Sequence, residues 1–262
     1  MASSLISGLI ASGHSPSQIW VSDINQDALT ALSNTLQVNT SVSNAEVIEQ
    51  VDVIVLAVKP QVLREVAESC AATIQNKRPL VVSIAAGITQ QSLSRWLGAD
   101  IAVVRCMPNT PALVLTGATG LHANACVDDT QRDLAENILR AVGMSIWVDD
   151  EAELDTVTAV SGSGPAYYFL LMEAMERAAL QLGMTEETAR LLIQQTALGA
   201  AKIALESNES PEQLRKRVTS PGGTTEQAIN FFEQGGFRDL VAGAIAAAHQ
   251  RSIEMSKQLG EQ

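Results

Sequence analysis

The chain has 262 residues, of which 46% are hydrophobic and 18% charged, a balance typical of a globular protein with one large or two smaller domains. Its formal net charge of −12 argues against binding to nucleic acid or to anionic membranes, because both require a basic surface. Any anionic substrate must therefore be captured by local hydrogen-bond donors.

The first part of the chain, to about residue 150, alternates strand patterns with helix patterns. Residues 52–58 are almost entirely apolar, as expected of a strand buried on both faces. The predicted strands cover residues 18–22, 52–58, 80–84, 101–105, 116–122 and 145–148, and the predicted helices cover residues 26–36, 62–74, 90–97 and 130–142. This alternation predicts an α/β domain over residues 1–150, with a parallel sheet and right-handed crossovers.

After residue 150 the strand pattern disappears. Helices are predicted over residues 153–183, 186–206, 211–218, 226–234 and 236–259, which are rich in Ala, Leu, Gln and Glu. The second domain, residues 151–262, is therefore predicted to be all-helical. Residues 240–249 are too apolar to face water on every side, so we expect them to contribute to an oligomer interface.

Cysteine usage and targeting signals indicate the compartment. Cys70, Cys106 and Cys126 are odd in number and widely separated, which is typical of free thiols in a reducing environment. The three histidines are isolated, so we expect no metal site. No apolar run approaches the length of a membrane span, and the N-terminal stretch lacks the basic region of a signal peptide. We therefore expect a cytoplasmic protein.

Residues 220–225 (Ser-Pro-Gly-Gly-Thr-Thr) lie between two predicted helices. A proline and two glycines at a helix start leave backbone N–H groups unpaired, and such a start attracts carboxylates or phosphates. The three hydroxyl side chains add further polar groups. The alternative is an ordinary helix N-cap after a turn.

Polar and turn residues follow several predicted strands, where open parallel sheets bind ligands. Asp23 is placed to accept hydrogen bonds from an adenosine ribose, or to cap the next helix, and Asn44 has the same ambiguity. Lys59 faces either a phosphate or water. Residues 84–87 form a small-residue strand end, and residues 106–111 form a rigid loop that carries one amide and one hydroxyl. Their joint placement predicts a dinucleotide site.

The sequence Ser-Gly-Ser-Gly-Pro-Ala at residues 161–166 interrupts the first long helix of the second part. Such a break lets backbone amides reach a ligand, or it serves as a packing kink.

Together these segments resemble the pyrroline-5-carboxylate reductase family, the last enzyme of proline biosynthesis, and the resemblance covers almost the whole chain. It implies a Rossmann domain and a helical domain that dimerises by interleaving helices, with dimers forming a decamer in many members. It also implies reduction of 1-pyrroline-5-carboxylate to L-proline by NAD(P)H. The matching segments are residues 56–61, 83–87, 107–111, 161–167 and 218–225.

The resemblance also implies a substrate site. The substrate carboxylate would lie on Ser220 and on the amides of Gly222, Gly223 and Thr224, and Thr225 would hydrogen-bond the ring nitrogen as the catalytic residue. A protonated imine is already electrophilic, so no metal is expected. Orienting it against the hydride donor is worth roughly 7–11 kcal/mol. The Thr225 hydroxyl is a poor general acid, so solvent is the expected proton source.

The predicted cofactor residues come from the matching segments and from the strand ends. The first two residues are added because they look like the tail of the family's Gly-Asn-Met-Ala run. The complete set is Met1, Ala2, Asp23, Asn44, Ala57, Val58, Lys59, Pro60, Ile84, Ala85, Ala86 and Asn109.

The chain departs from the family pattern at three places. The family's first strand and glycine-rich loop, which seat the pyrophosphate, are not in this sequence, so we interpret it as truncated and expect weakened cofactor binding. Asn208, with Glu209 beside it, occupies the position of an acidic residue found near the substrate amine in some members. Asp23 would repel a 2′-phosphate and favours NADH, whereas the family more often uses NADPH, so the predicted cofactor is NADP(H) or NAD(H).

Two alternatives stay open at this point. A related β-hydroxyacid dehydrogenase would need a catalytic lysine in the second domain, for which Lys202 is the nearby candidate. A non-catalytic helical oligomer with a degraded nucleotide domain would explain the missing strand, but it would not explain the intact Ser220–Thr225 run.

Overall fold

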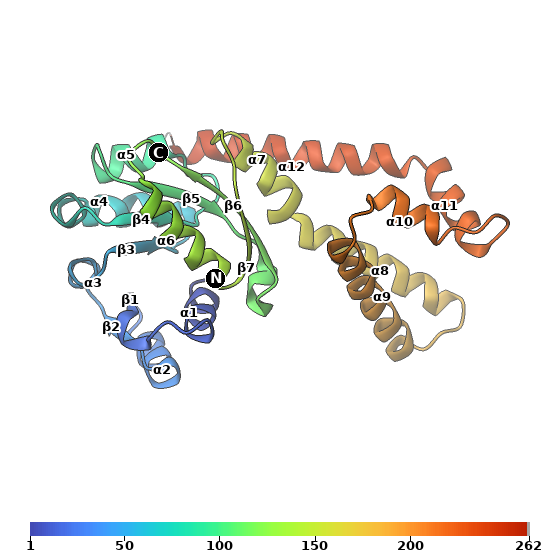
Figure 1. Ribbon diagram of the computed structural model, residues 1–262, viewed down its shortest axis with the longest axis horizontal. Coiled ribbons are helices and arrows are strands. Elements are labelled where there is room, and N and C mark those ends of the chain that lie inside the picture. The colour runs from blue at the N-terminus through green and yellow to red at the C-terminus, as the bar shows by residue number, and fades with distance from the viewer. Residues whose placement is uncertain (261–262) are drawn as a thin grey trace. The chain divides into compact units, whose positions relative to one another are not determined.

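The computed structural model describes residues 1–260. The chain forms two compact units: Met1–Ser163 together with the chain from Ala247 onward, and Gly164–Ala246 (Figure 1). The division by role, with a cofactor-binding domain at residues 1–150 and a dimerisation and substrate-binding domain at residues 151–262, stays a prediction.

The first unit contains a five-stranded sheet in the order β3-β4-β5-β6-β7. Strands β3, β4 and β5 are parallel, β6 is antiparallel to β5, and β7 is parallel to β6. The bounds are Val53–Leu56 (β3), Leu80–Ser83 (β4), Val103–Met107 (β5), Gly117–Ala123 (β6) and Gly143–Trp147 (β7). The prediction of an entirely parallel sheet is wrong at β6. The link from β5 holds only the 3₁₀ turn η2, Thr110–Val114, which is too short for a crossover helix.

A second, two-stranded parallel sheet pairs β1, Trp20–Ser22, with β2, Asn39–Ser41. Within residues 1–260, no ladder joins this pair to β3, so β1 and β3 each present one unpaired edge. The α/β domain is therefore built on a sheet in two pieces. Strand β2 was not predicted, because its sequence Asn-Thr-Ser carries no apolar signal.

Side chains cap several helices of the first unit, although α1, α4 and α7 have no such cap. Asn25 accepts hydrogen bonds from two N–H groups at the start of α2, and Thr89 and Asp128 cap α5 and α6 in the same way. The bounds are Ala2–Ala11 (α1), Gln26–Leu36 (α2), Asn44–Gln50 (α3), Pro60–Lys77 (α4), Gln90–Leu97 (α5), Asp129–Arg140 (α6) and Glu153–Val157 (α7), with the 3₁₀ turn η1 at Pro16–Gln18. A π-helical turn, η3, follows at Thr158–Gly162.

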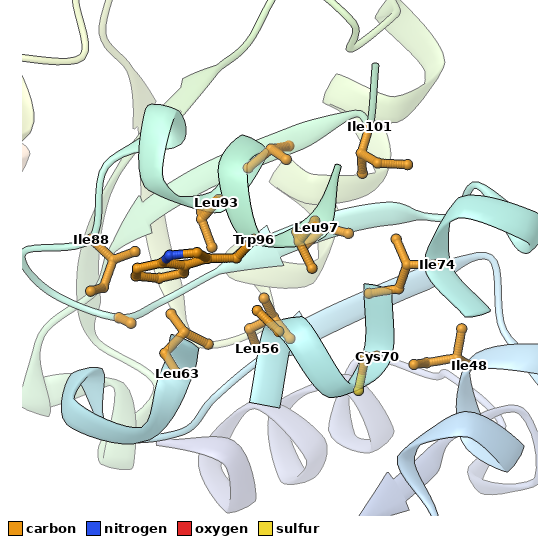
Figure 2. Close-up of a cluster of buried hydrophobic side chains, with 14 residues drawn as sticks. Ile48, Leu56, Leu63, Cys70, Ile74, Ile88, Leu93, Trp96, Leu97 and Ile101 are labelled. Carbon is orange, nitrogen blue, oxygen red and sulfur yellow. The ribbon is translucent and has the colours of Figure 1, made fainter. Parts of the chain in front are cut away.

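Strands β3, β4 and β5 are covered on both faces, whereas Met144 and Ile146 of β7 are exposed. Figure 2 shows one cluster, in which Leu63 and Ile74 of α4 meet Trp96 and Leu97 of α5. The cluster on the other face is built around Leu5 of α1 and also includes residues of α6 and the sheet. Covering both faces fixes the carboxyl ends of the strands, which position the candidate ligand site.

The second unit is all-helical, as predicted, but it has almost no interior of its own. Within residues 164–246, all of which the structure describes, only Gly164 and Ala189 are buried. Phe169, Leu198 and Leu240 are 64%, 63% and 72% exposed. The helices are Gly164–Gln181 (α8), Glu186–Glu206 (α9), Pro211–Arg217 (α10), Thr224–Gln234 (α11) and Phe237–Gly260 (α12).

The last part of α12 belongs to the first unit. Ser252 donates a 2.5 Å hydrogen bond to Asp155 of α7, and Arg95 of α5 donates to the carbonyl of Gly260. Gly87, at φ +73°, lies close to Leu259. The chain thus returns to its first unit after completing the second.

An ion pair connects β5 to the segment before α7. The guanidinium of Arg105, whose side chain is 10% exposed, pairs with Glu151, and the same Glu151 oxygen accepts the N–H of Gln90 at 2.6 Å. A carboxylate at the start of α5 is favoured by the helix dipole. This contact therefore joins the strand, the helix and the exit of the α/β domain.

We predict that Glu151→Ala lowers the free energy of unfolding by about 3 kcal/mol, because Arg105 is left buried without its partner. Glu151→Gln should lose less, since it still accepts from Gln90. The control, Glu68→Ala, breaks an exposed pair with Arg64 and should lose less than about 1 kcal/mol. Urea denaturation at a fixed protein concentration measures all three. Equal losses for Glu151→Ala and Glu68→Ala would contradict the assignment.

Candidate functional site

The Ser220–Thr225 run forms a tight turn that leads into α11. The N–H of Gly223 donates to the carbonyl of Ser220 at 3.0 Å, Pro221 occupies the second position of the turn, and Gly222 has φ +72°. A positive φ at the third position, after a proline, is the signature of a type II turn, and it requires glycine. The sequence therefore dictates this local geometry.

Gly223 is the N-cap of α11, and no side chain caps the helix. The N–H groups of Thr224, Thr225 and Glu226 thus lack partners in the preceding turn of helix. Within the described chain, neither threonine hydroxyl has a hydrogen bond. The helix start therefore offers unpaired amides and two hydroxyl groups, as an anion site requires.

One amide of this turn already holds a carboxylate. The N–H of Gly222 donates to Oε2 of Glu226 at 2.8 Å. This contact shows that the Gly222 amide is accessible to an anionic oxygen. Sequence reasoning missed Glu226, although a glutamate three residues after an N-cap commonly reaches back to the start of its helix.

The three amides predicted to bind the substrate carboxylate differ in their hydrogen bonds. The Gly223 amide is used inside the turn, the Gly222 amide is held by Glu226, and the Thr224 amide is unpaired at the helix start. The predicted substrate residues, which are consecutive in sequence, thus form a tight turn and a helix start, and their role in substrate binding stays a prediction.

The acidic and basic side chains beside the turn are paired. Glu209, next to Asn208, forms a 2.9 Å ion pair with Arg217, so its carboxylate has a partner within α10. A hydrogen bond from Lys216 holds the pKa of Glu212 below its usual range, and Arg238 does the same for the pKa of Glu233. These pairs keep charge near the turn balanced in an otherwise acidic chain.

Most of the predicted cofactor residues lie at the carboxyl ends of parallel strands in the first unit. Asp23 follows β1, is exposed, and accepts the N–H of Asn25 at 2.8 Å. The cap of α2 is Asn25, so the alternative role of Asp23 as helix cap does not hold. Asn44 is the first residue of α3, whose cap is Ser43.

The loops after β3 and β4 present small residues and a helix start. Ala57 and Val58 follow β3, Lys59 is the N-cap of α4, and Pro60 is its first residue. No side chain caps α4, which leaves its first amides available to a phosphate. Ile84, Ala85 and Ala86 follow β4 and lead to Gly87. The predicted cofactor residues of these two loops therefore follow adjacent parallel strands.

The remaining three predicted cofactor residues, Met1, Ala2 and Asn109, differ in their surroundings, and Met1 and Ala2 do not follow a strand. Met1 and Ala2 form the start of α1, where Met1 is the N-cap without a side-chain hydrogen bond. Asn109 follows β5, and both heteroatoms of its carboxamide bond to the protein backbone, at Ala118 and at Ser161.

Other candidate chemistry finds no support. Burial raises the pKa of the Cys106 thiol, so it stays protonated and is not a nucleophile. Lys202 is exposed on α9, 3.8 Å from Glu206. In residues 1–260 no three His, Cys, Asp or Glu side chains gather as a metal site would require, and no helix combines the length and the hydropathy of a membrane span.

The chain is similar to known proteins over its two parts and over its whole length. Residues 151–255 match the family model for pyrroline-5-carboxylate reductase dimerisation, and residues 1–87 match that for NADP oxidoreductase, coenzyme F420-dependent. The chain is 51% identical to the pyrroline-5-carboxylate reductase of Pseudomonas aeruginosa over 261 residues, covering 100% of this chain and 95% of the relative.

Solved structures give the same result. A pyrroline-5-carboxylate reductase from Coxiella burnetii, 48% identical, superposes with a TM-score of 0.94 over 97% of this chain and 94% of that one. The Plasmodium falciparum pyrroline carboxylate reductase with NADP bound, 28% identical, gives 0.86 over 98% and 94%. The chain belongs to the pyrroline-5-carboxylate reductase family.

Proposed function

We propose that this protein reduces 1-pyrroline-5-carboxylate to L-proline, the last step of proline biosynthesis. The observation that carries the proposal is the uncapped start of α11 after the Ser220–Gly223 turn, found in a chain of this family. The start of α11 supplies amides for a carboxylate and hydroxyls for a ring nitrogen, the two polar groups of this substrate.

In this proposal the substrate carboxylate binds Ser220 and the amides of Gly222, Gly223 and Thr224. The amide of Thr224 is unpaired, and Gly222 exchanges its contact with Glu226 for one with the substrate. The Gly223 amide takes part only if its turn bond to Ser220 loosens or is shared. The helix start thus selects a small anion in spite of the acidic chain.

Thr225 is proposed to bond the ring nitrogen. Its hydroxyl lies one residue along α11 from Thr224, in the first turn of the helix. A neutral hydroxyl orients the ring rather than protonates it, and solvent supplies the proton. The contribution of the protein is then mainly orientation, which is worth roughly 7–11 kcal/mol.

The cofactor is proposed to lie along the carboxyl ends of β1, β3 and β4. When bound, NADPH or NADH supplies the hydride. Lys59 and the uncapped start of α4 would hold phosphate, and Ala57 and Ala86 would leave room for a flat ring, whereas Ala85 is buried in the core and would not contact the cofactor through its side chain. Asp23 would lie near the adenosine ribose.

We also propose a cytoplasmic homodimer that assembles further into a decamer. The exposed apolar side chains of the helical unit support association, because one chain alone leaves them in water. The free thiols of Cys70, Cys106 and Cys126 support a reducing compartment.

Substitution of Thr225 tests its proposed contact with the ring nitrogen. Thr225→Ala should lower kcat for proline formation about 10- to 100-fold, the expected loss of one hydrogen bond to a charged nitrogen. Thr225→Ser keeps the hydroxyl and should retain most of the activity. A steady-state assay with NADPH measures both, and equal rates for Thr225→Ala and the unaltered protein would remove Thr225 from the mechanism.

Substitution of Glu226 tests whether its carboxylate competes with the substrate carboxylate. Glu226→Gln removes a negative charge from the proposed carboxylate site, so KM for pyrroline-5-carboxylate should fall about fivefold. The control, Glu212→Gln, removes a charge from an exposed pair with Lys216 in the same unit and should leave KM unchanged. A KM that is unchanged or higher in Glu226→Gln would contradict the competition between the two carboxylates.

Substitution of Asp23 tests its proposed influence on the choice between NADPH and NADH. Asp23→Asn should raise the ratio of kcat/KM for NADPH over NADH about tenfold, because it removes a carboxylate that repels the 2′-phosphate. Asp27→Asn, a substitution in the first turn of α2, is the matched control and should leave the ratio unchanged. Equal ratios for the two variants would place Asp23 away from the ribose.

A further inference from the structure

Asn109 joins two segments of the first unit that are distant in sequence. Its Oδ1 accepts the N–H of Ala118, the second residue of β6, at 2.9 Å. Its Nδ2 donates to the carbonyl of Ser161, in the π-helical turn η3, at 3.1 Å. The side chain is 9% exposed, so both bonds are largely shielded from water.

The sequence explains why the Ser161 carbonyl accepts a hydrogen bond from a side chain outside its helix. In a continuous α-helix, the N–H of residue 165 would donate to the carbonyl of residue 161, but residue 165 is proline and has no N–H. The chain instead makes a π-type bond from Ser163 to Thr158, 2.8 Å long. The carboxamide of Asn109 supplies a donor that the helix lacks.

Close packing reinforces this contact. A Cβ on Gly162 would come within 2.5 Å of Cε of Met107, the last residue of β5. A Cβ on Gly120 of β6 would come within 2.8 Å of the Val157 side chain. The η3 turn is therefore held near the end of β5 by the Asn109 bond to Ser161 and by the close approach of Gly162 to Met107, while the preceding helix α7 packs on β6 through Val157 and Gly120.

We propose that Asn109 is a positioning residue for hydride transfer rather than a direct cofactor ligand. It holds η3 against the loop after β5, at the carboxyl edge of the sheet where the cofactor is proposed to bind, so the inference rests on the proposed function. Single π-helical turns are frequent at functional sites, and a displacement of 1 Å near the reacting groups can cost about 10²-fold in rate.

The chain provides a matched control in Asn124. Its Oδ1 accepts from the N–H groups of Val103 and Cys126, and its Nδ2 donates to the carbonyl of Ile101 at 2.9 Å. Asn124 thus makes the same kind of bridge, but at the amino end of β5. Asn→Asp at either position keeps the acceptor and replaces the donor with an oxygen that repels a carbonyl.

The test compares Asn109→Asp with Asn124→Asp in the full chain. We expect kcat to fall at least about tenfold in Asn109→Asp relative to Asn124→Asp, with the Kd for NADPH within about twofold. Hydrogen–deuterium exchange should accelerate in residues 158–163 only in Asn109→Asp. Equal kcat values, unchanged exchange, or a raised Kd with unchanged kcat at saturation would each overturn the positioning role.

A second variant covers the case in which Asn109→Asp does not fold. Asn109→Ala removes the donor to Ser161 without adding a charge, and it should lower kcat with an unchanged Kd for NADPH. An unchanged kcat in Asn109→Ala overturns the proposal. Unaltered protein that forms no proline overturns the proposed function, whereas active protein with an unimpaired Asn109→Asp variant overturns only the role of Asn109.

Discussion

A helical unit that cannot bury its own apolar side chains constrains the whole molecule. Between residues 164 and 246 only Gly164 and Ala189 are buried, while Phe169 and Leu240 are largely exposed. Residues 151–255 match the family model for pyrroline-5-carboxylate reductase dimerisation, which supports an association that would remove this surface from water. Because α11 belongs to this unit, the proposed substrate site lies in the part of the chain that has the least interior of its own.

The first unit differs from the helical unit because it has two buried apolar clusters of its own, and its loops carry the predicted cofactor residues. The two clusters cover the faces of strands β3, β4 and β5. Arg105 lies in the middle of β5 and pairs with Glu151, and Asn109 follows β5 and bonds to Ser161, near the point where the chain leaves the unit. The candidate site thus rests on polar contacts supported by a dry core.

Local signals explain what could be predicted from the sequence. Helices α2, α5 and α9 have the predicted bounds because Asn25, Thr89 and Thr185 cap them, and the turn at Pro221 and Gly222 follows from residue chemistry. Non-local contacts explain the misses. The direction of β6 depends on the length of the loop after β5, and β2 is too short and polar to show a strand pattern. The hydrogen bonds of Asn109 and Glu226 depend on how the folded chain places their side chains.

The path of α12 makes the helical unit an insertion within the α/β unit. The first unit is built from Met1–Ser163 and from the chain after Ala247, so separating the two units requires two cuts. A fragment ending at Ser163 would lack Ser252 and Leu259, which contact Asp155 and the core around Leu93. Neither unit can therefore be exchanged between relatives as a simple terminal cassette, and recombination within this family should preserve both junctions together.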